Sequence, residues 1–266
     1  MPWDWHKPLF EHAREIDITI FSSPFDESAV DLLEDLNVPA YKIASFETVD
    51  LRLIDYVART GKPMIISTGM ASEDEIREAV DTARAGGCSE LALLTCVSSY
   101  PAMPSDYNLS RIVDMRERFQ TVVGLSDHTL DNTCAIASIT LGGCIIEKHF
   151  TLDRKGGGAD DSFSLEPNDM KNLCESSLAA WQSIGSPEYG TKSTEKNNAQ
   201  YRRSLYFVKS LKKGDVIKID DIRSVRPGFG LPTKMFDSVV GSEVNCNVSY
   251  GDPVKLADII MKSDID

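Results

Sequence analysis

The chain has 266 residues, of which 42% are hydrophobic, and its 28 basic and 41 acidic residues give a net charge of −13. This length suits one large domain and a small one, and the hydrophobic content is ordinary for a globular core. The acidic balance has the wrong sign for a surface that binds nucleic acid or an anionic membrane, so neither is expected as a partner. An anionic substrate therefore needs a local basic pocket.

The sequence carries no sign of a membrane span or a secretory leader. No run approaches the roughly 20 uncharged apolar residues of a membrane helix, and residues 1–6 (MPWDWH) lack the basic and apolar regions of a signal peptide. The six cysteines contain no CxxC pair, which favours reduced thiols over structural zinc or disulfides. These features predict a cytoplasmic protein.

Short apolar runs rich in β-branched residues alternate with helical patterns. We expect strands at 18–21, 41–44, 63–67, 91–96, 121–125 and 144–147, and helices at about 27–36, 51–59, 72–86 and 167–184. Ser72 and Glu75 form a capping box at the start of the third helix. Strand–helix alternation of this kind calls for a parallel sheet buried on both faces, which is either an open doubly wound sheet or a closed barrel.

Clusters of polar side chains at the ends of nearly all the expected strands favour the barrel. No GxGxxG follows the first strand, which disfavours a dinucleotide-binding open sheet. Reactive groups at the carboxyl ends of many strands are instead typical of an eight-stranded barrel. About six units are visible where such a barrel has eight. We therefore predict an α/β fold over residues 1–184, a (β/α)8 TIM-type barrel lacking about its first two βα units.

The pattern changes after residue 184. Residues 185–200 are polar and contain Gly, Ser, Pro and Asn, which predicts an interdomain linker. Residues 201–266 then carry short strand-like runs at 205–208, 215–219 and 253–256, separated by KGD and YGD turns. We expect a small β-rich domain there, of a size that benefits from support by a neighbour.

The strings SDH (126–128) and EKH (147–149) close two of the expected strands. Because alternate side chains share a strand face, the outer members of each string point one way and the middle members the other. The imidazoles of His128 and His149 then converge with the carboxylate of Glu147, and this donor set suits Mn²⁺, Co²⁺ or Zn²⁺ with open positions for water or substrate. The alternative is that each histidine is an ordinary core residue.

Lys42 and several serine hydroxyls at strand ends form a second group of candidate site residues. A phosphate group is bound by a positive charge and by several hydrogen-bond donors on short side chains at the same level of the barrel mouth. The sequence offers Lys42 for the charge and Ser23, Ser67, Ser98 and Ser126 for the donors. A strand-end serine can instead cap the following helix. Lys42 fits that alternative less well, because a lysine directed at a barrel mouth loses hydration unless an anion compensates it.

Six strings in order along the chain resemble the sialic-acid-type synthases, which build nine-carbon nonulosonic acids: FSSPFD (21–26), YKIAS (41–45), ISTGM (66–70), GLSDHT (124–129), EKHFTLD (147–153) and SFSLEP (162–167). Within that family, FSSPFD, PWDWH at 2–6 and the stretch from Gly156 through SFSLEP look more like pseudaminic acid synthases than N-acetylneuraminate synthases. Residues from about 201 to 259 resemble the family's SAF domain, which is similar to type III antifreeze proteins.

The resemblance implies roles for individual residues. His128 and His149 match the metal ligands, and Glu147 and Lys42 the catalytic pair. The implied substrate-binding residues are, in chain order, Ser23, Ser45, Ser67, Ser98, Tyr100, Ser126, Asp160 and Arg226. Among these, Asp160 matches an acidic residue that contacts the sugar, and Arg226 matches a lid arginine that reaches the partner's substrate. Ser98 departs from the family pattern, in which asparagine is common.

The implied reaction joins phosphoenolpyruvate to an N-acetylated amino sugar, giving a nonulosonic acid and phosphate, with a divalent ion such as Mn, Mg or Co. The pseudaminic resemblance favours a 2,4-diacetamido-2,4,6-trideoxy hexose as acceptor, and the alternatives are N-acetylneuraminate or legionaminate synthesis. The SAF resemblance implies a domain-swapped homodimer, in which each small domain covers the partner's barrel.

Two further hypotheses belong to other functional classes. The family's first barrel strands carry a glutamate and a second phosphate-binding lysine, and we expect these upstream of residue 1. A catalytically inactive fragment that associates with an intact synthase is therefore an alternative to an enzyme. Ice binding by the C-terminal domain is the other alternative, although a lid is the better interpretation of such a module attached to a barrel.

Overall fold

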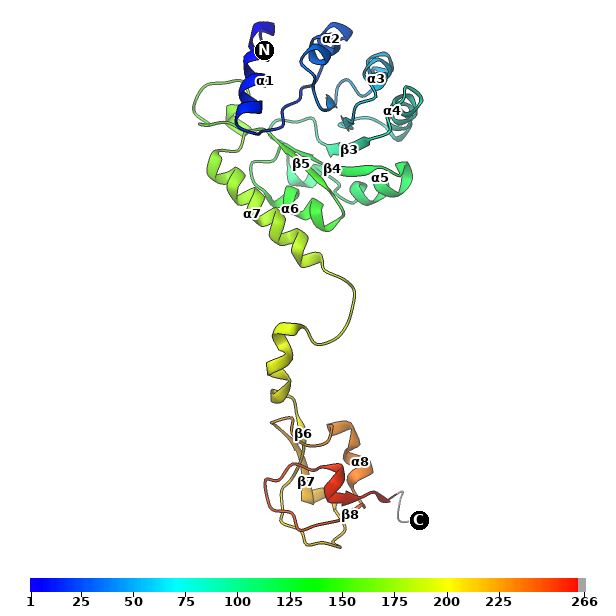
Figure 1. Cartoon of the computed structure of the whole chain (residues 1–266), viewed down its shortest axis with the longest axis vertical. Coiled ribbons are helices and arrows are strands. Elements are labelled where there is room, and N and C mark those ends of the chain that lie inside the picture. Colours follow the sequence, from blue (N-terminus) through cyan, green and yellow to red (C-terminus); the bar gives the residue numbers. More distant parts are fainter. Residues whose placement is uncertain (263–266) are drawn as a thin grey trace. The chain divides into compact units, whose positions relative to one another are not determined.

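The structure, a computed structural model, describes residues 1–262, so the last four residues of the predicted C-terminal domain lie outside the described residues. The chain divides into two compact units, Met1–Ser186 and Pro187–Asp266 (Figure 1). Among the described residues, no helix combines the length and the apolar content that a bilayer crossing requires.

The first unit is built on a curled parallel sheet of five strands in sequence order. The strands are β1 (Tyr41–Ile43), β2 (Met64–Ser67), β3 (Leu91–Cys96), β4 (Val122–Asp127) and β5 (Ile145–Lys148). The α-helices are α1 (His6–Glu15), α2 (Glu27–Asp35), α3 (Leu51–Ala58), α4 (Glu73–Ala85), α5 (Arg111–Phe119), α6 (Thr133–Thr140) and α7 (Pro167–Ile184), with short 3-10 turns η1 (Trp3–Trp5), η2 (Pro104–Asp106) and η3 (Asp161–Phe163). Figure 1 shows helices along the outer side of the curled sheet. The predicted α/β fold of barrel type is confirmed.

The segment predicted as the first strand, 18–21, does not form a regular strand. Its continuation at Ser22 makes a single parallel bridge with Tyr41, and the Lys42 N–H donates to the Ser22 carbonyl at 3.2 Å. Within residues 1–262 no other segment extends this pairing. A run of alternating hydrogen bonds is what holds an extended segment as a strand, and here it is limited to one bridge.

The pleat separates an apolar outer face from a more polar inner one. Outward residues such as Ile43, Ile66 and Leu93 pack against the helices in the main hydrophobic cluster. On the inner face, Cys96 lies beside Ser126 on the next strand, and Ser126 beside Glu147. Strands β4 and β5 approach closely at Gly124, where an added Cβ would collide with the carbonyl oxygen of Ile145. Glycine is therefore required at position 124, two residues before the polar Ser126 on the same face of β4.

The sequence also determines where helices begin. The predicted capping box of α4 is confirmed, since the Glu75 N–H donates to the Ser72 hydroxyl at 3.3 Å and the Ser72 N–H donates to the Glu75 carboxylate at 2.7 Å. Asp26 and Asp50 accept in the same way from the first turns of α2 and α3. These caps fix the strand-end segments that precede them.

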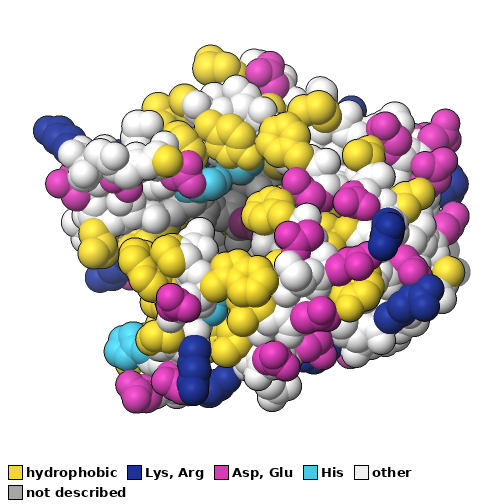
Figure 2. All heavy atoms as spheres, turned by 90° about the horizontal axis from the view of Figure 1, so that it is seen from above, with side chains coloured by type: hydrophobic (Ala, Val, Ile, Leu, Met, Phe, Trp, Pro, Cys, Tyr) yellow, Lys and Arg dark blue, Asp and Glu magenta, His cyan; other side chains and the backbone are white. Residues whose placement is uncertain are grey.

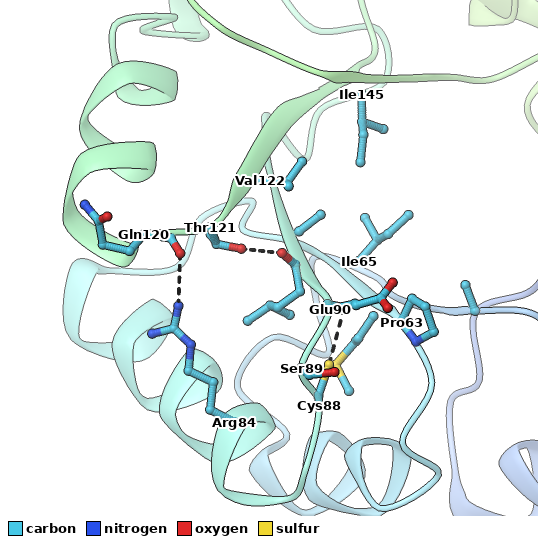
Figure 3. Close-up of a pocket in the computed structure, with 14 residues that line it drawn as sticks. Pro63, Ile65, Arg84, Cys88, Ser89, Glu90, Gln120, Thr121, Val122 and Ile145 are labelled. Atoms are coloured by element: carbon cyan, nitrogen blue, oxygen red, sulfur yellow. Dashed lines mark hydrogen bonds between the residues drawn. The ribbon is translucent and has the colours of Figure 1, made fainter.

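A wide cavity of about 630 Å³ lies at the amino ends of the strands (Figure 3). Its lining includes Pro63, Ile65, Val122 and Ile145. The Arg84 guanidinium at its side donates to the backbone carbonyls of Phe119 and Gln120. This cavity is thus mostly apolar, and it lies at the amino ends of the strands, whereas the predicted site residues lie at the carboxyl ends.

The second unit contains two small antiparallel sheets around a core of its own. Strand β6 (Ser204–Phe207) pairs with β7 (Ile222–Val225), and β8 (Glu243–Val244) with β9 (Ile259–Ile260). Its helical turns are η4 (Ser193–Tyr201), η5 (Ile219–Asp221), η6 (Thr233–Met235), α8 (Phe236–Val239) and η7 (Leu256–Asp258). Of the three predicted strand-like runs, 205–208 overlaps β6, whereas 215–219 and 253–256 contribute only isolated bridges. Part of the predicted linker, 185–200, forms η4.

Asp221 ties two segments of this unit together. Its buried carboxylate accepts from the Lys218 N–H at 2.8 Å and from the Lys209 ammonium at 3.0 Å. Burial acts to raise the pKa of this carboxyl, but the hydrogen bonds from Lys218 and Lys209 outweigh burial and hold the pKa below its ordinary value. The ionised form therefore stabilises the fold above the unfolded-state pKa of about 3.9, and this contribution is lost as the pH falls through the folded-state pKa.

We expect acid to loosen the second unit in an Asp221-dependent way. Between about pH 5 and about pH 3, hydrogen-exchange protection of β6 and β7, corrected for intrinsic exchange rates, falls in the native chain. In Asp221→Asn the protection is lower at neutral pH and depends less on pH, because no carboxylate titrates at this position. Equal pH slopes in the two proteins would contradict the assignment.

Candidate functional site

A cavity of about 300 Å³ opens at the carboxyl ends of the strands, where parallel barrels carry their sites. Among the predicted residues, its lining contains Ser23, Lys42, Ser45, Ser67, Tyr100, Ser126, His128, Glu147 and His149. The space-filling view in Figure 2 shows a hollow with histidine at its edge and hydrophobic side chains around it. Ser98, Asp160 and Arg226 are the predicted residues that do not line the cavity.

Lys42 lies at the centre of a charged network on the inner face. It is 7% exposed, and its ammonium donates to the Ser67 hydroxyl at 2.8 Å and lies 3.4 Å from one carboxylate oxygen of Glu147. The other oxygen of Glu147 accepts from the Ser126 hydroxyl at 2.7 Å. A buried ammonium needs such an anionic partner. An anion entering the cavity would meet the Lys42 ammonium and two hydroxyl groups, with the Glu147 carboxylate beside them.

The two histidines from neighbouring strand ends face the same cavity, with their ring centroids 5.2 Å apart. Nδ1 of His128 lies 2.7 Å from the Val97 carbonyl oxygen, which can only accept, so Nδ1 carries the proton. Nε2 is left unprotonated, with the Ser126 hydroxyl 3.4 Å away. Nδ1 of His149 lies 3.4 Å from the Asp160 carboxylate. Burial lowers the pKa of His128, which favours the neutral imidazole.

This arrangement fits an open divalent-metal site. An oxygen partner on Nδ1 is how proteins orient metal-binding imidazoles and leave Nε2 as the donor. Water or substrate oxygen would complete the coordination of an ion held by His128 and His149. Within residues 1–262, no group of three or more His, Cys, Asp or Glu side chains is close enough to share an ion. The carboxylate of Glu147, predicted to converge with the imidazoles, binds Lys42 and Ser126.

Aromatic rings pack around the histidines. The Tyr100 ring centroid lies 4.3 Å from that of His128 and 5.7 Å from that of His149. Phe163 packs 5.0 Å from the His149 ring and 5.3 Å from Tyr100. Burial raises the pKa of Tyr100, so its phenol stays neutral. The imidazoles are thereby held between rings that restrict their rotation.

The glycine-rich stretch after β5 is an ordered turn and not a loose connection. The Asp161 carboxylate accepts from the Gly158 N–H at 2.6 Å and from the Thr151 hydroxyl at 2.7 Å, and these bonds lower its pKa. The chain then returns to the sheet end, where the Leu165 N–H donates to the His149 carbonyl at 2.8 Å. This path brings Asp160 and Phe163 to the His149 ring.

Ser98 supports the cavity wall from one step away. Its hydroxyl lies 2.9 Å from the hydroxyl of Ser45, which does line the cavity. Gly69, at φ +48°, lies against both side chains, and an added Cβ would lie 2.6 Å from the Ser45 Cβ and 2.8 Å from the Ser98 hydroxyl. The glycine is therefore needed for this pair to form. A direct contact of Ser98 with substrate stays a prediction.

Arg226 belongs to the second unit, where it is exposed and directly follows β7. The two units are compact bodies in their own right. The predicted reach of Arg226 into a substrate site therefore stays a prediction.

Two residues at the site were missed by sequence reasoning. Tyr107 is buried, accepts the backbone N–H of His128 at 2.6 Å and donates to the Ser126 carbonyl at 3.4 Å. Burial raises the pKa of Tyr107, which keeps this donor protonated. Phe163 contacts His149 as described above. Both residues lie in irregular segments or short turns, where no periodic pattern identifies their contacts.

Comparison with known proteins finds relatives over nearly the whole chain. The NeuB family model matches residues 1–189, and the SAF domain model matches residues 202–260. The chain is 40% identical to pseudaminic acid synthase of Helicobacter pylori, over 97% of this chain and 76% of that protein. It is 37% identical to N,N'-diacetyllegionaminic acid synthase of Legionella pneumophila, over 92% of this chain and 70% of that protein.

A solved structure extends the likeness to the fold. The N-acetylneuraminic acid (sialic acid) synthetase of Leptospira borgpetersenii, crystallised with citrate, superposes with a TM-score of 0.70 at 30% identity, covering 74% of this chain and 69% of that one. The chain therefore belongs to the NeuB family and carries a SAF domain after its parallel-sheet unit.

Proposed function

We propose that the chain is a phosphoenolpyruvate-dependent nonulosonic acid synthase that uses a 2,4-diacetamido-2,4,6-trideoxy hexose, as a pseudaminic acid synthase does. The observation that carries the proposal is one cavity in a NeuB-family chain that is lined by a buried lysine ammonium and by the imidazoles of His128 and His149. The 40% identity to the Helicobacter pylori protein supports the choice of acceptor.

The inner-face network suits the phosphate of phosphoenolpyruvate. Lys42 supplies the positive charge, and the Ser67 hydroxyl, which accepts from Lys42, keeps its own hydrogen to donate. The Ser126 hydroxyl donates to Glu147 and would turn to the phosphate when phosphoenolpyruvate binds. Binding an anion here gives Lys42 a second partner besides Glu147. The phosphate end of the substrate is then fixed relative to the histidines on the neighbouring strand ends.

The reaction forms one carbon–carbon bond and one carbon–oxygen bond and breaks one carbon–oxygen bond. C3 of phosphoenolpyruvate attacks the aldehyde carbon and water adds at C2, and one proton of that water passes to the aldehyde oxygen, which becomes a hydroxyl. Phosphate then leaves from C2 with the remaining proton, and C2 becomes a ketone. A divalent ion such as Mn, Mg or Co, when bound by His128 and His149, supplies Lewis-acid polarisation of the aldehyde. Glu147 is held between Lys42 and Ser126, where its carboxylate can exchange a proton at the reacting oxygens.

The exposed rim of the cavity supports a covering domain. Large apolar side chains follow several strand ends, among them Phe46, Met70 at 73% exposure, Phe150 and Leu152 at 80% exposure. Apolar groups gathered at the mouth of a site are typical of a surface that another element covers. We propose a homodimer in which the SAF domain of a second copy covers this rim and contributes Arg226.

The compartment follows from the chemistry of the thiols and the substrate. All six cysteines, including buried Cys96 in the cavity wall, are unpaired. A reducing compartment keeps such thiols intact. We propose that the chain works in the cytoplasm, where phosphoenolpyruvate is produced.

The alternative acceptors are those of legionaminic and N-acetylneuraminic acid synthesis. The identity is 37% to the Legionella pneumophila protein and 30% to the Leptospira borgpetersenii protein, against 40% to the Helicobacter pylori protein and 35% to another pseudaminic acid synthase. The pseudaminic acceptor is chosen on the highest of these values. The three acceptors differ in their substituents and stereochemistry, so direct comparison separates them.

We expect the purified chain, with Mn²⁺, to release phosphate from phosphoenolpyruvate only when the diacetamido trideoxy hexose is present. N-acetylmannosamine and the legionaminate precursor are the matched acceptors, and a chelator-treated sample is the control for the metal. Preference for N-acetylmannosamine would refute the pseudaminic assignment. Absence of release with all three sugars, while the chain still binds Mn²⁺, would favour the inactive partner of an intact synthase.

A further inference from the structure

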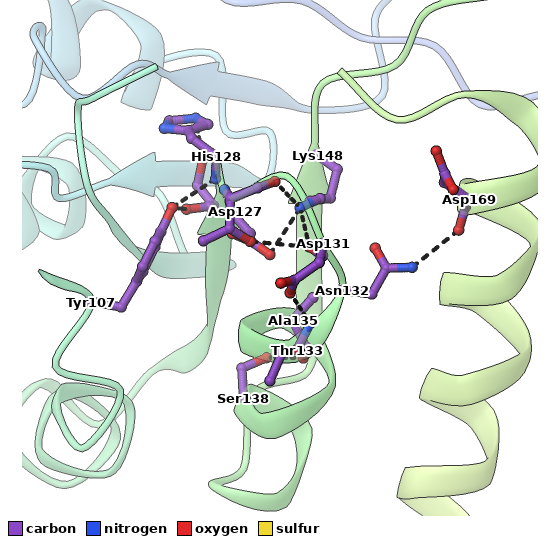
Figure 4. A network of polar contacts seen from close by, with 12 residues as sticks. Tyr107, Asp127, His128, Asp131, Asn132, Thr133, Ala135, Ser138, Lys148 and Asp169 are labelled. Carbon is purple, nitrogen blue, oxygen red and sulfur yellow. Dashed lines mark hydrogen bonds and ion pairs between the residues drawn. The ribbon is translucent and has the colours of Figure 1, made fainter. Parts of the chain in front are cut away.

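A fully buried ion pair between Asp127 and Lys148 lies on the outer face of the sheet, close to His128 (Figure 4). The Lys148 ammonium is 3.0 Å from the Asp127 carboxylate, and the two side chains are 2% and 0% exposed. Asp127 and Lys148 are direct partners in the register of β4 and β5. Each immediately precedes one histidine, His128 or His149. The ion pair and the imidazoles therefore occupy opposite faces of the same two strand ends.

Each hydrogen of the Lys148 ammonium has an acceptor. Besides Asp127, the group donates to the Thr129 carbonyl at 2.7 Å and to the Asp131 carbonyl at 2.9 Å. The second carboxylate oxygen of Asp127 accepts from the Thr129 N–H at 2.9 Å. The turn that follows His128 thus wraps around a side chain of β5. Because each hydrogen of the ammonium has an acceptor and the carboxylate also accepts a backbone N–H, these bonds offset the cost of removing the two charges from water.

These contacts restrict His128 from three directions. Asp127 links the preceding residue to β5, the wrapped turn links the following residues to Lys148, and the Tyr107 hydroxyl accepts the N–H of His128 itself. The Lys148 backbone also leads directly into His149. A change in the Asp127–Lys148 pair that moves either strand end would therefore change the separation of the two imidazoles.

We propose that Asp127 and Lys148 are positioning residues that set the separation of His128 and His149, and through it the affinity of the site for a divalent ion. The proposal rests on the proposed function, because it requires the histidines to bind metal. Ligands perform well only within about 0.5 Å of their productive geometry. Loss of groups that orient metal ligands typically lowers metal affinity about 10–100-fold.

Three variants separate positioning from simple stabilisation. Lys148→Met keeps the length of the side chain and removes the charge, Asp127→Asn keeps the acceptor for the Thr129 N–H, and the double variant leaves no orphaned buried charge. Each is titrated with Mn²⁺ and Co²⁺ at a temperature where denaturant unfolding shows it to be folded, and the visible spectrum of bound Co²⁺ reports ligand geometry. Lys62→Met is the matched control, since Lys62 pairs with Glu34 at 2.7 Å in the same unit.

We expect both single variants to bind Mn²⁺ about 10–100-fold more weakly than the native chain and to change the Co²⁺ spectrum. The double variant regains part of the lost stability, because no unpaired charge remains buried. Its metal affinity stays low, because the Thr129 and Asp131 carbonyls have still lost Lys148. Lys62→Met loses stability and keeps native affinity.

Native affinity and an unchanged Co²⁺ spectrum in folded Lys148→Met would overturn the proposal and leave the ion pair a stabilising element only. Full recovery of affinity in the double variant would overturn it as well, because relief of the orphaned charge would then explain the whole effect. If the native chain itself binds neither ion, the metal assignment in the proposed function fails, and this result is distinct from either outcome in the variants.

Discussion

Replacing His128 or His149 with alanine is expected to abolish tight Mn²⁺ binding and to lower phosphate release from phosphoenolpyruvate by more than about a hundredfold, which exceeds the usual effect of losing a group that only orients a ligand. Both imidazoles line the cavity and Nε2 of His128 is unprotonated, and each variant leaves a single imidazole to hold the ion. The measurement is the initial rate of phosphate release at several Mn²⁺ concentrations.

His12→Ala is the control for this pair. His12 is a surface residue of α1, 66% exposed, and lies 3.4 Å from Glu15. We expect its removal to change neither the Mn²⁺ affinity nor the rate. Undiminished release by His128→Ala in metal-depleted buffer would rule out the metal assignment, because catalysis would then proceed without both the ion and one of its ligands.

The second large effect is expected for Lys42→Met. We expect kcat/KM for phosphoenolpyruvate to fall by about 10²–10³-fold, the range seen when one electrostatic contact to a reacting group is removed from a site sheltered from water. Lys42 is the buried cation closest to Glu147, and its loss leaves that carboxylate to repel the phosphate. The fall is expected to include a higher KM for phosphoenolpyruvate, with a smaller change in KM for the sugar.

Two comparisons test the specificity of this effect. Ser67→Ala removes one hydrogen bond that the same ammonium donates to a neutral hydroxyl. Hydrogen bonds with a charged partner are worth about 1.5 kcal/mol or more, so kcat/KM is expected to fall roughly tenfold. Lys171→Met alters an exposed lysine of α7, 72% exposed, and is expected to have no effect. An equal rise in KM for phosphoenolpyruvate and for the sugar would contradict a role of Lys42 confined to the phosphate end of the site.

Most of the site residues that were predicted correctly follow from the alternation of side chains between the two faces of a strand. Because side chains two apart share a face, the strings at 126–128 and 147–149 predicted inward Ser126, His128, Glu147 and His149, and these residues line one cavity. The prediction that Asp127 and Lys148 point the other way is also confirmed, although nothing in the sequence indicated that they pair. Parallel pairing of adjacent strands in register joins them, and register is a property of the whole sheet.

The features that the sequence did not predict depend on contacts between distant segments. Phe163 reaches His149 only because the Asp161 turn reverses the chain, and Tyr107 reaches His128 from a segment between β3 and β4. The run at 18–21 has strand composition but only one bridge at its end. In the second unit, the residues of β7 gave no strong alternation, and their pairing with β6 determines their structure.

Because β4 and β5 carry cavity residues on one face and the buried ion pair on the other, the changes in length that these two strands can accept are limited. Substitutions can alter the cavity residues or the outer ion pair one at a time. Deletion of a single residue inside β5, however, would turn Lys148 toward the cavity and Glu147 and His149 toward the helices, since every side chain changes face when a strand shifts by one position. Insertions and deletions should therefore be tolerated in the loops around the site and excluded from these two strands.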